Sequence, residues 1–189
     1  MIYALVDKET LKQKGVSLKT LLQHISTYSN IPILQYRNKL ASLEEKKEDL
    51  DIIREYYHGK LIINDNIELI AYADGLHLGQ EDLRKYSNDL QEAVSLVRQK
   101  IGTKLLGLST HDKAEILEAN TLDLDYIGLG AYRATDTKSE ANVGGKTLLE
   151  AAIYSKHPVG IIGGVRMDDI FEEPIVYKVI GSGLYNGLK

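Results

Sequence analysis

The chain has 189 residues, a formal charge of −4 at pH 7 and 43% hydrophobic residues, enough to bury one sizeable core as a single domain over residues 1–189. Acidic and basic residues are interleaved without a basic stripe, so we expect no nucleic acid as the main partner. Because cysteine is absent, disulfides and cysteine nucleophiles are excluded and any metal is bound through oxygen or histidine. The first apolar run, at residues 2–6, is too short for a signal sequence or a membrane span, and we expect a cytoplasmic protein.

Short apolar runs of strand length alternate with amphipathic helical segments along the chain. Eight such units predict a (β/α)8 TIM barrel, and the competing architecture is an open, flavodoxin-like sheet. Since barrels usually have about 200 residues or more, we expect short loops and abbreviated C-terminal helices. The predicted strands are 2–6, 31–36, 61–63, 75–78, 105–108, 126–129, 158–162 and 175–180; the predicted helices are 17–25, 43–57, 66–72, 83–100, 111–120 and 146–154, with short segments from 167 and after 180.

Two consecutive predicted strands end in acidic and amide groups. Asn64 and Asp65 follow the third strand, and Asp82 follows the fourth. Because parallel strands end on one face of a barrel, Asp65 and Asp82 should converge, and two adjacent carboxylates suggest Mg²⁺ held with a phosphate-bearing substrate. Taken singly, Asn64-Asp65 is more typical of a helix N-cap, and Asp82 of an acid in the first turn of a helix.

Polar side chains also mark the second and fourth predicted strands. Gln35, Arg37 and Lys39 alternate in the sequence QYRNK, so they lie on one side of an extended segment and should point into the barrel mouth together. An amide and two cations would suit an anion, whereas the alternative is a solvated strand exit. His77 alternates with leucines, so it faces either the barrel interior or the helical layer, and a strand histidine is more often a packed residue than a base.

Hydroxyl groups and glycines follow the later predicted strands. Ser109 ends the fifth strand and is a candidate for substrate contact. After the sixth strand, residues 135–138 could wrap an anion with backbone amides and a lysine, or could form a surface loop without such a role. Backbone amides at 163–164 and 181–183 reach the same mouth, where barrels often bind phosphate.

Five of these motifs in order resemble the thiamine phosphate synthase family. Its signature reads Q-x-R-x-K, N-D, A-D-G-x-H-x-G-Q-x-D, a glycine-rich T-x-T-K segment and I-G-G. This chain has QYRNK, ND, ADGLHLGQED, GLGAYRATDTK and IIGGV with similar spacing, over nearly its whole length to about Gly183. The resemblance implies a transferase that joins 4-amino-2-methyl-5-hydroxymethylpyrimidine diphosphate to 4-methyl-5-(2-phosphoethyl)thiazole, or its carboxylated form, and releases diphosphate and thiamine phosphate with Mg²⁺ as cofactor.

The resemblance also implies roles for residues at the strand ends. Loss of diphosphate leaves a cation that the aminopyrimidine delocalises, so the protein mainly neutralises the leaving group and holds the thiazole nitrogen nearby, without a side-chain nucleophile. The implied metal ligands are Asp65 and Asp82; the catalytic residues are Arg37, Lys39, Ser109 and Lys138; the diphosphate ligands are Arg37, Lys39, Asn64 and Lys138; Gln35 and Ser109 contact the pyrimidine or the leaving group; and Thr135, Thr137, Gly164, Gly181 and Ser182 receive the thiazole phosphate.

Some positions depart from the family pattern. Ala131, Arg133 and Ala134 stand where the family usually has proline and bulky or aromatic residues, which bears on the shape of the pyrimidine pocket. Gly181 stands where a serine is common, and the stretch 167–174 is too brief for a full seventh helix. The phosphate end of the predicted pocket is therefore abbreviated.

Two alternatives stand beside the synthase. A thiazole tautomerase-like isomerase would use His77 or His111 as its base, although it would gain nothing from the metal carboxylate in GQED. A non-catalytic, thiamine-pathway ligand-binding barrel would keep the fold with a damaged pocket. In each case we expect small-molecule partners and no membrane, and a homo-oligomer is compatible with the sequence.

Overall fold

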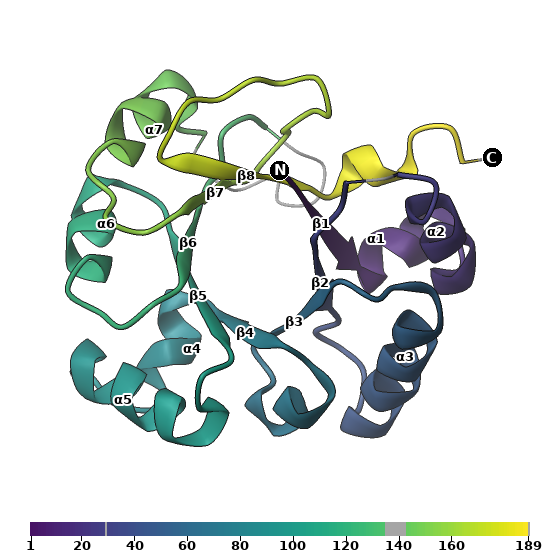
Figure 1. The fold of residues 1–189 in the computed structure, drawn as a ribbon, viewed down its shortest axis with the longest axis horizontal. Helices are drawn as coiled ribbons and strands as arrows, with labels where there is room; N and C mark the ends of the chain where they lie inside the picture. Colours follow the sequence, from purple (N-terminus) through teal and green to yellow (C-terminus); the bar gives the residue numbers. More distant parts are fainter. Residues whose placement is uncertain (29, 135–142, 189) are drawn as a thin grey trace.

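Eight parallel strands close into a barrel in sequence order. The computed structural model describes residues 1–28, 30–134 and 143–188. Each strand pairs with the next, and β8 returns to β1 through Ile2↔Lys178 and Ala4↔Ile180, so the predicted barrel is confirmed and the open sheet is wrong (Figure 1). The strands are β1 (Ile2–Asp7), β2 (Ile33–Arg37), β3 (Lys60–Asn64), β4 (Gly75–Leu78), β5 (Leu105–Thr110), β6 (Tyr126–Leu129), β7 (Val159–Ile161) and β8 (Ile175–Ile180).

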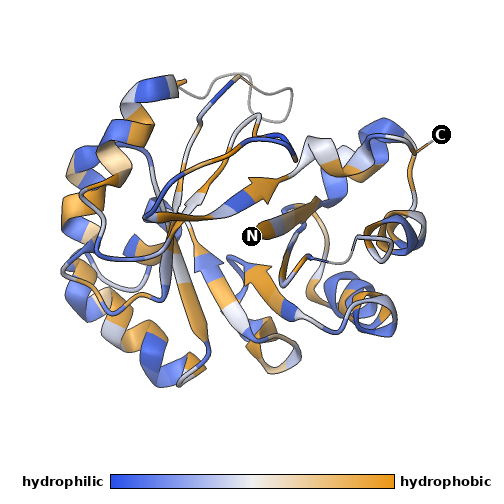
Figure 2. Ribbon diagram, turned by 45° about the horizontal axis from the view of Figure 1, so that its top comes forward, coloured by the Kyte–Doolittle hydropathy of each residue, from blue (hydrophilic) through white to orange (hydrophobic). Residues whose placement is uncertain are grey.

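Strand alternation divides the buried side chains between two layers. In β4, Leu76 and Leu78 join the large cluster between the sheet and the helices, and the residue between them, His77, faces the barrel interior. A smaller cluster inside the barrel contains Tyr3 and Tyr126. Figure 2 shows hydrophobic residues gathered on the strands, with hydrophilic and hydrophobic residues mixed on the helices. The helices therefore cover an apolar outer face of the sheet.

Local capping groups set where most helices begin. Ser42 and Glu45 form a reciprocal capping box at the start of α3, and Asp112 caps α6. Gly15 adopts a left-handed conformation that ends α1. The helices are α1 (Lys8–Lys14), α2 (Leu18–Ile25), α3 (Leu43–Tyr56), α4 (Gln80–Arg84), α5 (Leu90–Ile101), α6 (Lys113–Ala119) and α7 (Gly145–Ala152), with 3₁₀ helices η1 (Ile67–Tyr72) and η2 (Ser182–Tyr185).

Several predicted helices differ from those observed. The predicted helix 83–100 is two helices, because Asp89 caps a new helix by accepting a hydrogen bond from the Glu92 amide. The segment 66–72 is a 3₁₀ helix, and α1 was not predicted. The short helix expected from residue 167 is wrong, since no helix follows β7 before β8 among the described residues.

A connection without helical structure joins β7 to β8 and is held by the β6–α7 segment. The Arg133 guanidinium donates to both carboxylate oxygens of Asp169, at 2.6 and 3.0 Å, and to the Gly164 carbonyl at 3.0 Å. The ring of Phe171 packs edge-on against Tyr132, with ring centroids 5.5 Å apart. This connection takes the place of the helix that would follow β7 in a regular barrel (Figure 1).

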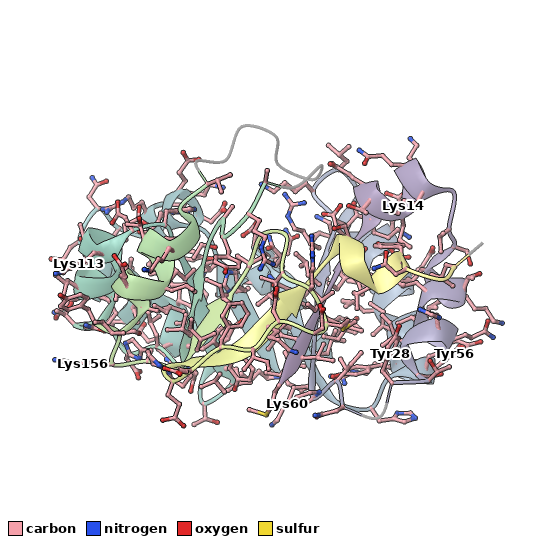
Figure 3. All side chains as sticks on the ribbon, turned by 90° about the horizontal axis from the view of Figure 1, so that it is seen from above. Lys14, Tyr28, Tyr56, Lys60, Lys113 and Lys156 are labelled. Carbon is pink, nitrogen blue, oxygen red and sulfur yellow. The ribbon has the colours of Figure 1, made fainter. Side chains whose placement is uncertain are left out.

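Exposed lysine side chains lie on the outside of the barrel. Figure 3 shows Lys14, Lys113 and Lys156 at the periphery of the helical layer, and all three are exposed. None of the helices in the described part of the chain is long and apolar enough to cross a membrane.

Candidate functional site

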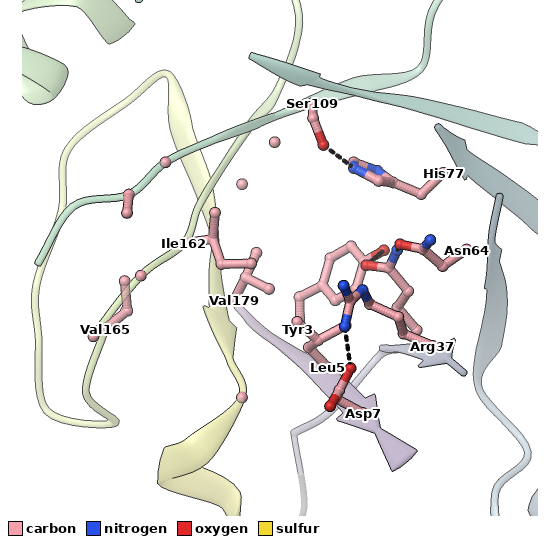
Figure 4. Close-up of a pocket in the computed structure, with 18 of the residues that line it drawn as sticks. Tyr3, Leu5, Asp7, Arg37, Asn64, His77, Ser109, Ile162, Val165 and Val179 are labelled. Atoms are coloured by element: carbon pink, nitrogen blue, oxygen red, sulfur yellow. Dashed lines mark hydrogen bonds and ion pairs between the residues drawn. The ribbon is translucent and has the colours of Figure 1, made fainter. Parts of the chain in front are cut away.

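A cavity of about 940 Å³ opens where the strands end, on the face where barrels bind their ligands. Figure 4 shows Arg37 and Asn64 on one side and Ser109 and His77 on another. Three predicted site residues, Thr135, Thr137 and Lys138, lie outside the described residues. The predicted site residues that line the cavity are Gln35, Arg37, Asn64, Ser109, Gly164, Gly181 and Ser182.

The guanidinium group of Arg37 projects into the cavity from the end of β2. It forms an ion pair with Asp7, a residue only 4% exposed that ends β1 (Figure 4). Asp7 also accepts a hydrogen bond of 2.9 Å from the Thr10 amide and so caps α1. A buried carboxylate that caps a helix thus fixes the position of the cation.

Lys39 is placed differently from Gln35 and Arg37. The latter two line the cavity as the alternation predicted, whereas Lys39 is exposed and does not line it. Lys39 instead lies near Asp65, and its positive charge lowers the pKa of Asp65, which burial raises. The expectation that all three side chains enter the mouth together is therefore wrong for Lys39, because β2 ends at Arg37 and the alternation does not continue beyond it.

The carboxylates of Asp65 and Asp82 interact with each other. Burial, and after it the neighbouring carboxylate of Asp82, raises the pKa of Asp65, while Lys39 and Arg37 act in the opposite direction. On its other side, Asp82 pairs with Lys85 at 2.6 Å. Asp65, directly after β3, and Asp82, in the α4 helix that follows β4, converge as predicted, although neither lines the main cavity.

The N-cap interpretation of Asn64-Asp65 is wrong. Asp65 has a φ of 64°, in the left-handed region that aspartate tolerates better than most residues, and its amide donates to the His77 carbonyl at 3.0 Å. Asn66 precedes η1 without a side-chain cap. The Asn64 side chain instead accepts a hydrogen bond from Gln35 on the neighbouring strand β2.

Two tyrosines that the sequence did not single out form the floor of the cavity. The Tyr3 and Tyr126 hydroxyls are 2.9 Å apart, and both side chains are almost fully buried. Burial raises the pKa of each phenol, so both remain protonated and can donate. Tyr3 donates to Gln35 Oε1 at 3.2 Å, and Gln35 Nε2 donates to Asn64 Oδ1 at 3.0 Å. Their alternation with outward-facing residues was the signal that could have found them.

His77 belongs to the same buried polar floor. Its Nδ1 lies 3.1 Å from the Tyr126 hydroxyl and its Nε2 lies 3.0 Å from Ser109 Oγ. Gly107 stands beside both rings, and a Cβ there would lie 2.2 Å from the Tyr126 ring and 2.6 Å from His77 Nδ1. A glycine at this position of β5 therefore leaves the space in which the imidazole and the phenol meet. His77 faces the barrel interior, which answers the question that the sequence left open.

Glycine backbone forms the opposite wall. Gly163 and Gly164 have φ values of 97° and 57°, which favour glycine, and a Cβ on Gly163 would lie 2.8 Å from Ala131. Tyr185, on η2 at the same end, has a buried hydroxyl without a hydrogen-bond partner in the described structure. Glycine backbone and the side chains around it line this end of the cavity.

These features define a (β/α)8-barrel protein with a pocket at the ends of its strands, lined by an arginine, amides, glycine backbone and apolar side chains. Within that class, the chain belongs to the thiamine monophosphate synthase family, whose sequence profile matches residues 2–173.

Curated relatives and a solved structure agree with this placement. The chain is 34% identical to the thiamine-phosphate synthase of Dictyoglomus thermophilum, over 76% of this chain and 64% of the relative. It is 39% identical to that of Caldicellulosiruptor bescii, over 76% and 65%, and 34% identical to that of Persephonella marina, over 87% and 77%. The chain thus matches just under two thirds of the length of the first two relatives. Thiamine phosphate pyrophosphorylase from Pyrococcus furiosus has the same fold, with a TM-score of 0.73 at 22% identity over 96% of this chain and 87% of that one.

Proposed function

We propose that the protein is a thiamine-phosphate synthase. It would join 4-amino-2-methyl-5-hydroxymethylpyrimidine diphosphate to 4-methyl-5-(2-phosphoethyl)thiazole, or its carboxylated form, and release diphosphate. Membership of the family supports the reaction class. The observation that carries the proposal is the meeting of Arg37, Asn64 and Ser109 in one cavity beside an interacting pair of carboxylates.

Asp65 and Asp82 fit a Mg²⁺ ion. Mg²⁺ is usually held by one or two carboxylates together with substrate phosphates, so a pair suffices, and no larger cluster of histidine and acidic residues lies among the described residues. The two carboxylates repel each other in a partly buried position, and a divalent cation would relieve that repulsion. When bound, Mg²⁺ would neutralise charge on the diphosphate. These two residues are therefore the proposed metal ligands.

The cationic side of the pocket would stabilise the departing diphosphate. Arg37 is held by a buried carboxylate and faces the cavity, and Asn64 lies at the end of the next strand. Lys39, near the acidic pair, and Lys138 would complete the diphosphate site. Because charge builds up on the leaving group as the C–O bond breaks, fixed donors there lower the barrier without a covalent intermediate.

The remaining pocket residues would hold the two organic groups. Gln35 and Ser109 lie on the polar floor and would contact the pyrimidine. The thiazole phosphate would lie against the glycine backbone at the opposite wall, where no charged side chain is needed because backbone amides bind phosphate. The proposed thiazole-phosphate residues are Gly164, Gly181 and Ser182, together with Thr135 and Thr137.

Turnover of the two substrates with Mg²⁺ tests the proposal. We expect thiamine phosphate and diphosphate to form in equal amounts, and Arg37→Gln to lower kcat/KM by about 10²–10³, the effect of removing one donor from a developing anion. Arg84→Gln, on the exposed face of α4, is the control and should leave turnover unchanged.

Two results would redirect the assignment. A wild-type chain that releases no diphosphate when both substrates are present would refute the synthase. Isomerisation of the carboxylated thiazole phosphate, lost in His77→Asn, would then favour the tautomerase-like alternative. Calorimetric binding of the phosphate ligands without any turnover would favour the binding barrel.

A further inference from the structure

A continuous chain of hydrogen bonds crosses the barrel beneath the cavity. It connects the end of β5 to the end of β3, which are on either side of β4, through the barrel interior. Both ends line the cavity and belong to the proposed pocket. The members in order are Ser109, His77, Tyr126, Tyr3, Gln35 and Asn64.

Each hydroxyl in this row of hydrogen bonds has a single proton to donate. Once one donor is known, the donor and acceptor of every other bond in the row follow. The Gln35 amide nitrogen donates to Asn64, so its oxygen accepts the single proton of Tyr3. The bond between the two tyrosines must then be donated by Tyr126. A tyrosine whose proton is used in this way can only accept from its remaining neighbour. Tyr126 therefore accepts from His77 Nδ1–H.

Counting protons in the same way also fixes the donor and acceptor at the Ser109 end. A neutral imidazole protonated at Nδ1 has a bare Nε2, which accepts the hydroxyl proton of Ser109. The free side of Ser109 Oγ then presents oxygen lone pairs. At the other end, Asn64 uses its oxygen to accept from Gln35, and its NH₂ group has no acceptor in the described part of the chain. The reverse direction would exchange donors and acceptors at both ends.

We propose that this chain holds His77 as the Nδ1–H tautomer and thereby gives the pocket a fixed polarity, with an acceptor at Ser109 and amide N–H donors at Asn64. The acceptor end suits the exocyclic amine of an aminopyrimidine. The Asn64 NH₂ group, at the donor end, suits a phosphate oxygen beside Arg37. If all the hydrogen bonds ran in the reverse direction, the Asn64 carbonyl oxygen would face the anion instead. The match to these two groups rests on the proposed function. Tyr3, Tyr126 and His77 are positioning residues, because they act on the ligand through others.

The tautomer can be measured without any substrate. Nitrogen-15 labelling of the five histidines and a long-range ¹H–¹⁵N correlation spectrum distinguish protonated from bare ring nitrogens. The His77 signals are assigned by their loss in His77→Gln. We expect Nδ1 to be protonated and Nε2 bare in the neutral ring. A neutral ring protonated at Nε2 would overturn the proposal, whatever the enzyme's activity.

Two variants test whether the two tyrosines set the tautomer of His77 through this row of hydrogen bonds, which we call the relay. Tyr126→Phe removes the acceptor of Nδ1–H, and His77 should shift to the Nε2–H form, which keeps a partner in Ser109. Tyr3→Phe should cause the same shift although the hydroxyl it removes is bonded to Tyr126 and Gln35, because Tyr126 is then free to donate to Nδ1. Either variant that folds, as judged by circular dichroism, and yet keeps the Nδ1–H form would contradict the relay.

Tyr177→Phe is the matched control. The Tyr177 ring packs edge-on against Tyr3 and Tyr126, with centroids 6.1 and 6.2 Å away, but its hydroxyl has no hydrogen bond within the described structure. We expect unchanged histidine signals in this variant. If the proposed function holds, kcat/KM for the pyrimidine substrate falls about tenfold in Tyr126→Phe, the effect of one lost hydrogen bond, and is unchanged in the control. A protein with the expected tautomer but no turnover would refute the synthase and leave the relay intact.

Discussion

Single polar groups inside the barrel differ in whether the fold satisfies them. Most of the buried hydroxyls and amides at the cavity floor are paired, as buried polar groups must be. Two residues at the mouth are not satisfied in the same way. The Tyr185 hydroxyl has no partner among the described residues, and Asp65 carries its charge beside another carboxylate. An unsatisfied hydroxyl and two neighbouring carboxylates each lower the stability of the folded state, so substitutions at these positions should give measurable changes in stability.

Tyr185→Phe should stabilise the protein by about 1 kcal/mol, because an unsatisfied buried hydroxyl costs about 1–3 kcal/mol. The matched control is Tyr57→Phe, in which the lost hydroxyl donates to the Ile31 carbonyl at 3.0 Å and stability should fall by about 1 kcal/mol. Urea unfolding of the two variants provides the comparison. A destabilised Tyr185→Phe would mean that this hydroxyl has a partner in solution.

Asp65→Asn should raise the melting temperature at pH 7 in the absence of Mg²⁺. Since the pKa of Asp65 is raised on folding, the native state binds the proton more tightly, and stability falls as pH rises from about 4, the unfolded pKa, through the folded pKa. The gain over wild type should therefore vanish below about pH 4. Asparagine tolerates the left-handed backbone at this position, so the exchange adds little strain.

Mg²⁺ gives this prediction a second measurement. A cation bound by the acidic pair should raise the melting temperature of the wild type, through preferential binding to the native state, and should have little effect on Asp65→Asn. Glu81→Gln, an exposed neighbour of Asp82, serves as the control and should respond like the wild type. An equal response of wild type and Asp65→Asn would remove the metal assignment.

Among the secondary-structure elements, the β7–β8 connection is the unusual one. A barrel strand is normally followed by a helix, and here the connection depends on the fork of Arg133 and on packing of Phe171 against Tyr132. Arg133 stands where the family usually has other residue types. Its hydrogen bonds to Asp169, and after them its charge, hold the pKa of that carboxyl below the ordinary value. The residue that departs from the family pattern, Arg133, therefore binds the connection that stands where a helix would follow β7.

Arg133→Ala should lower stability by about 1 kcal/mol, as expected for a two-pronged ion pair that is partly exposed. It also releases the Gly164 carbonyl at the cavity wall, so the KM for the thiazole phosphate should rise several-fold while the KM for the pyrimidine diphosphate changes less. Steady-state kinetics and thermal unfolding measure the two effects. Arg84→Ala is the control, because the contact of Arg84 with Glu118 is 3.8 Å long and lies on the surface. If Arg133→Ala raised the KM of both substrates equally, Arg133 would not act specifically on the wall at Gly164.

Across the whole molecule, the barrel is covered unevenly. All residues of β4 are buried, whereas the first four residues of β8 are partly exposed, on the side where no helix follows β7. Hydrogen bonds of strands beneath a complete helical layer open together with the global fold, and those near a thin cover open more easily. The seam between β7 and β8 should therefore be the least protected part of the barrel.

Hydrogen–deuterium exchange with mass spectrometry tests this expectation. Peptides covering β3 to β6 should exchange most slowly, and those covering 162–178 should exchange earlier. Saturating substrate should slow exchange at 162–164, because this backbone lines the cavity. Uniform protection around the ring would show that the helix is not needed to stabilise the seam.

The barrel and most residues of its mouth could be predicted from the sequence. Strand and helix periods are local, and parallel strands of a barrel must end on one face, so Arg37, Asn64 and Ser109 could be placed there from the sequence. The spacing of Asp65 and Asp82 likewise predicted that they approach each other. The helix break at Asp89 was missed because a cap within a continuous amphipathic pattern is a weak signal.

How the inward-facing residues meet could be seen only in the folded structure. Alternation says that Tyr3, His77 and Tyr126 could point inward, but the register of β4 and β5 with β6 and the empty space at Gly107 bring His77 and Tyr126 together. The turn at Asp65 excluded a cap, and the end of β2 left Lys39 outside the cavity. The contacts of His77, Tyr126 and Tyr3 depend on distances between strands far apart in sequence, and a local pattern carries no information about such distances.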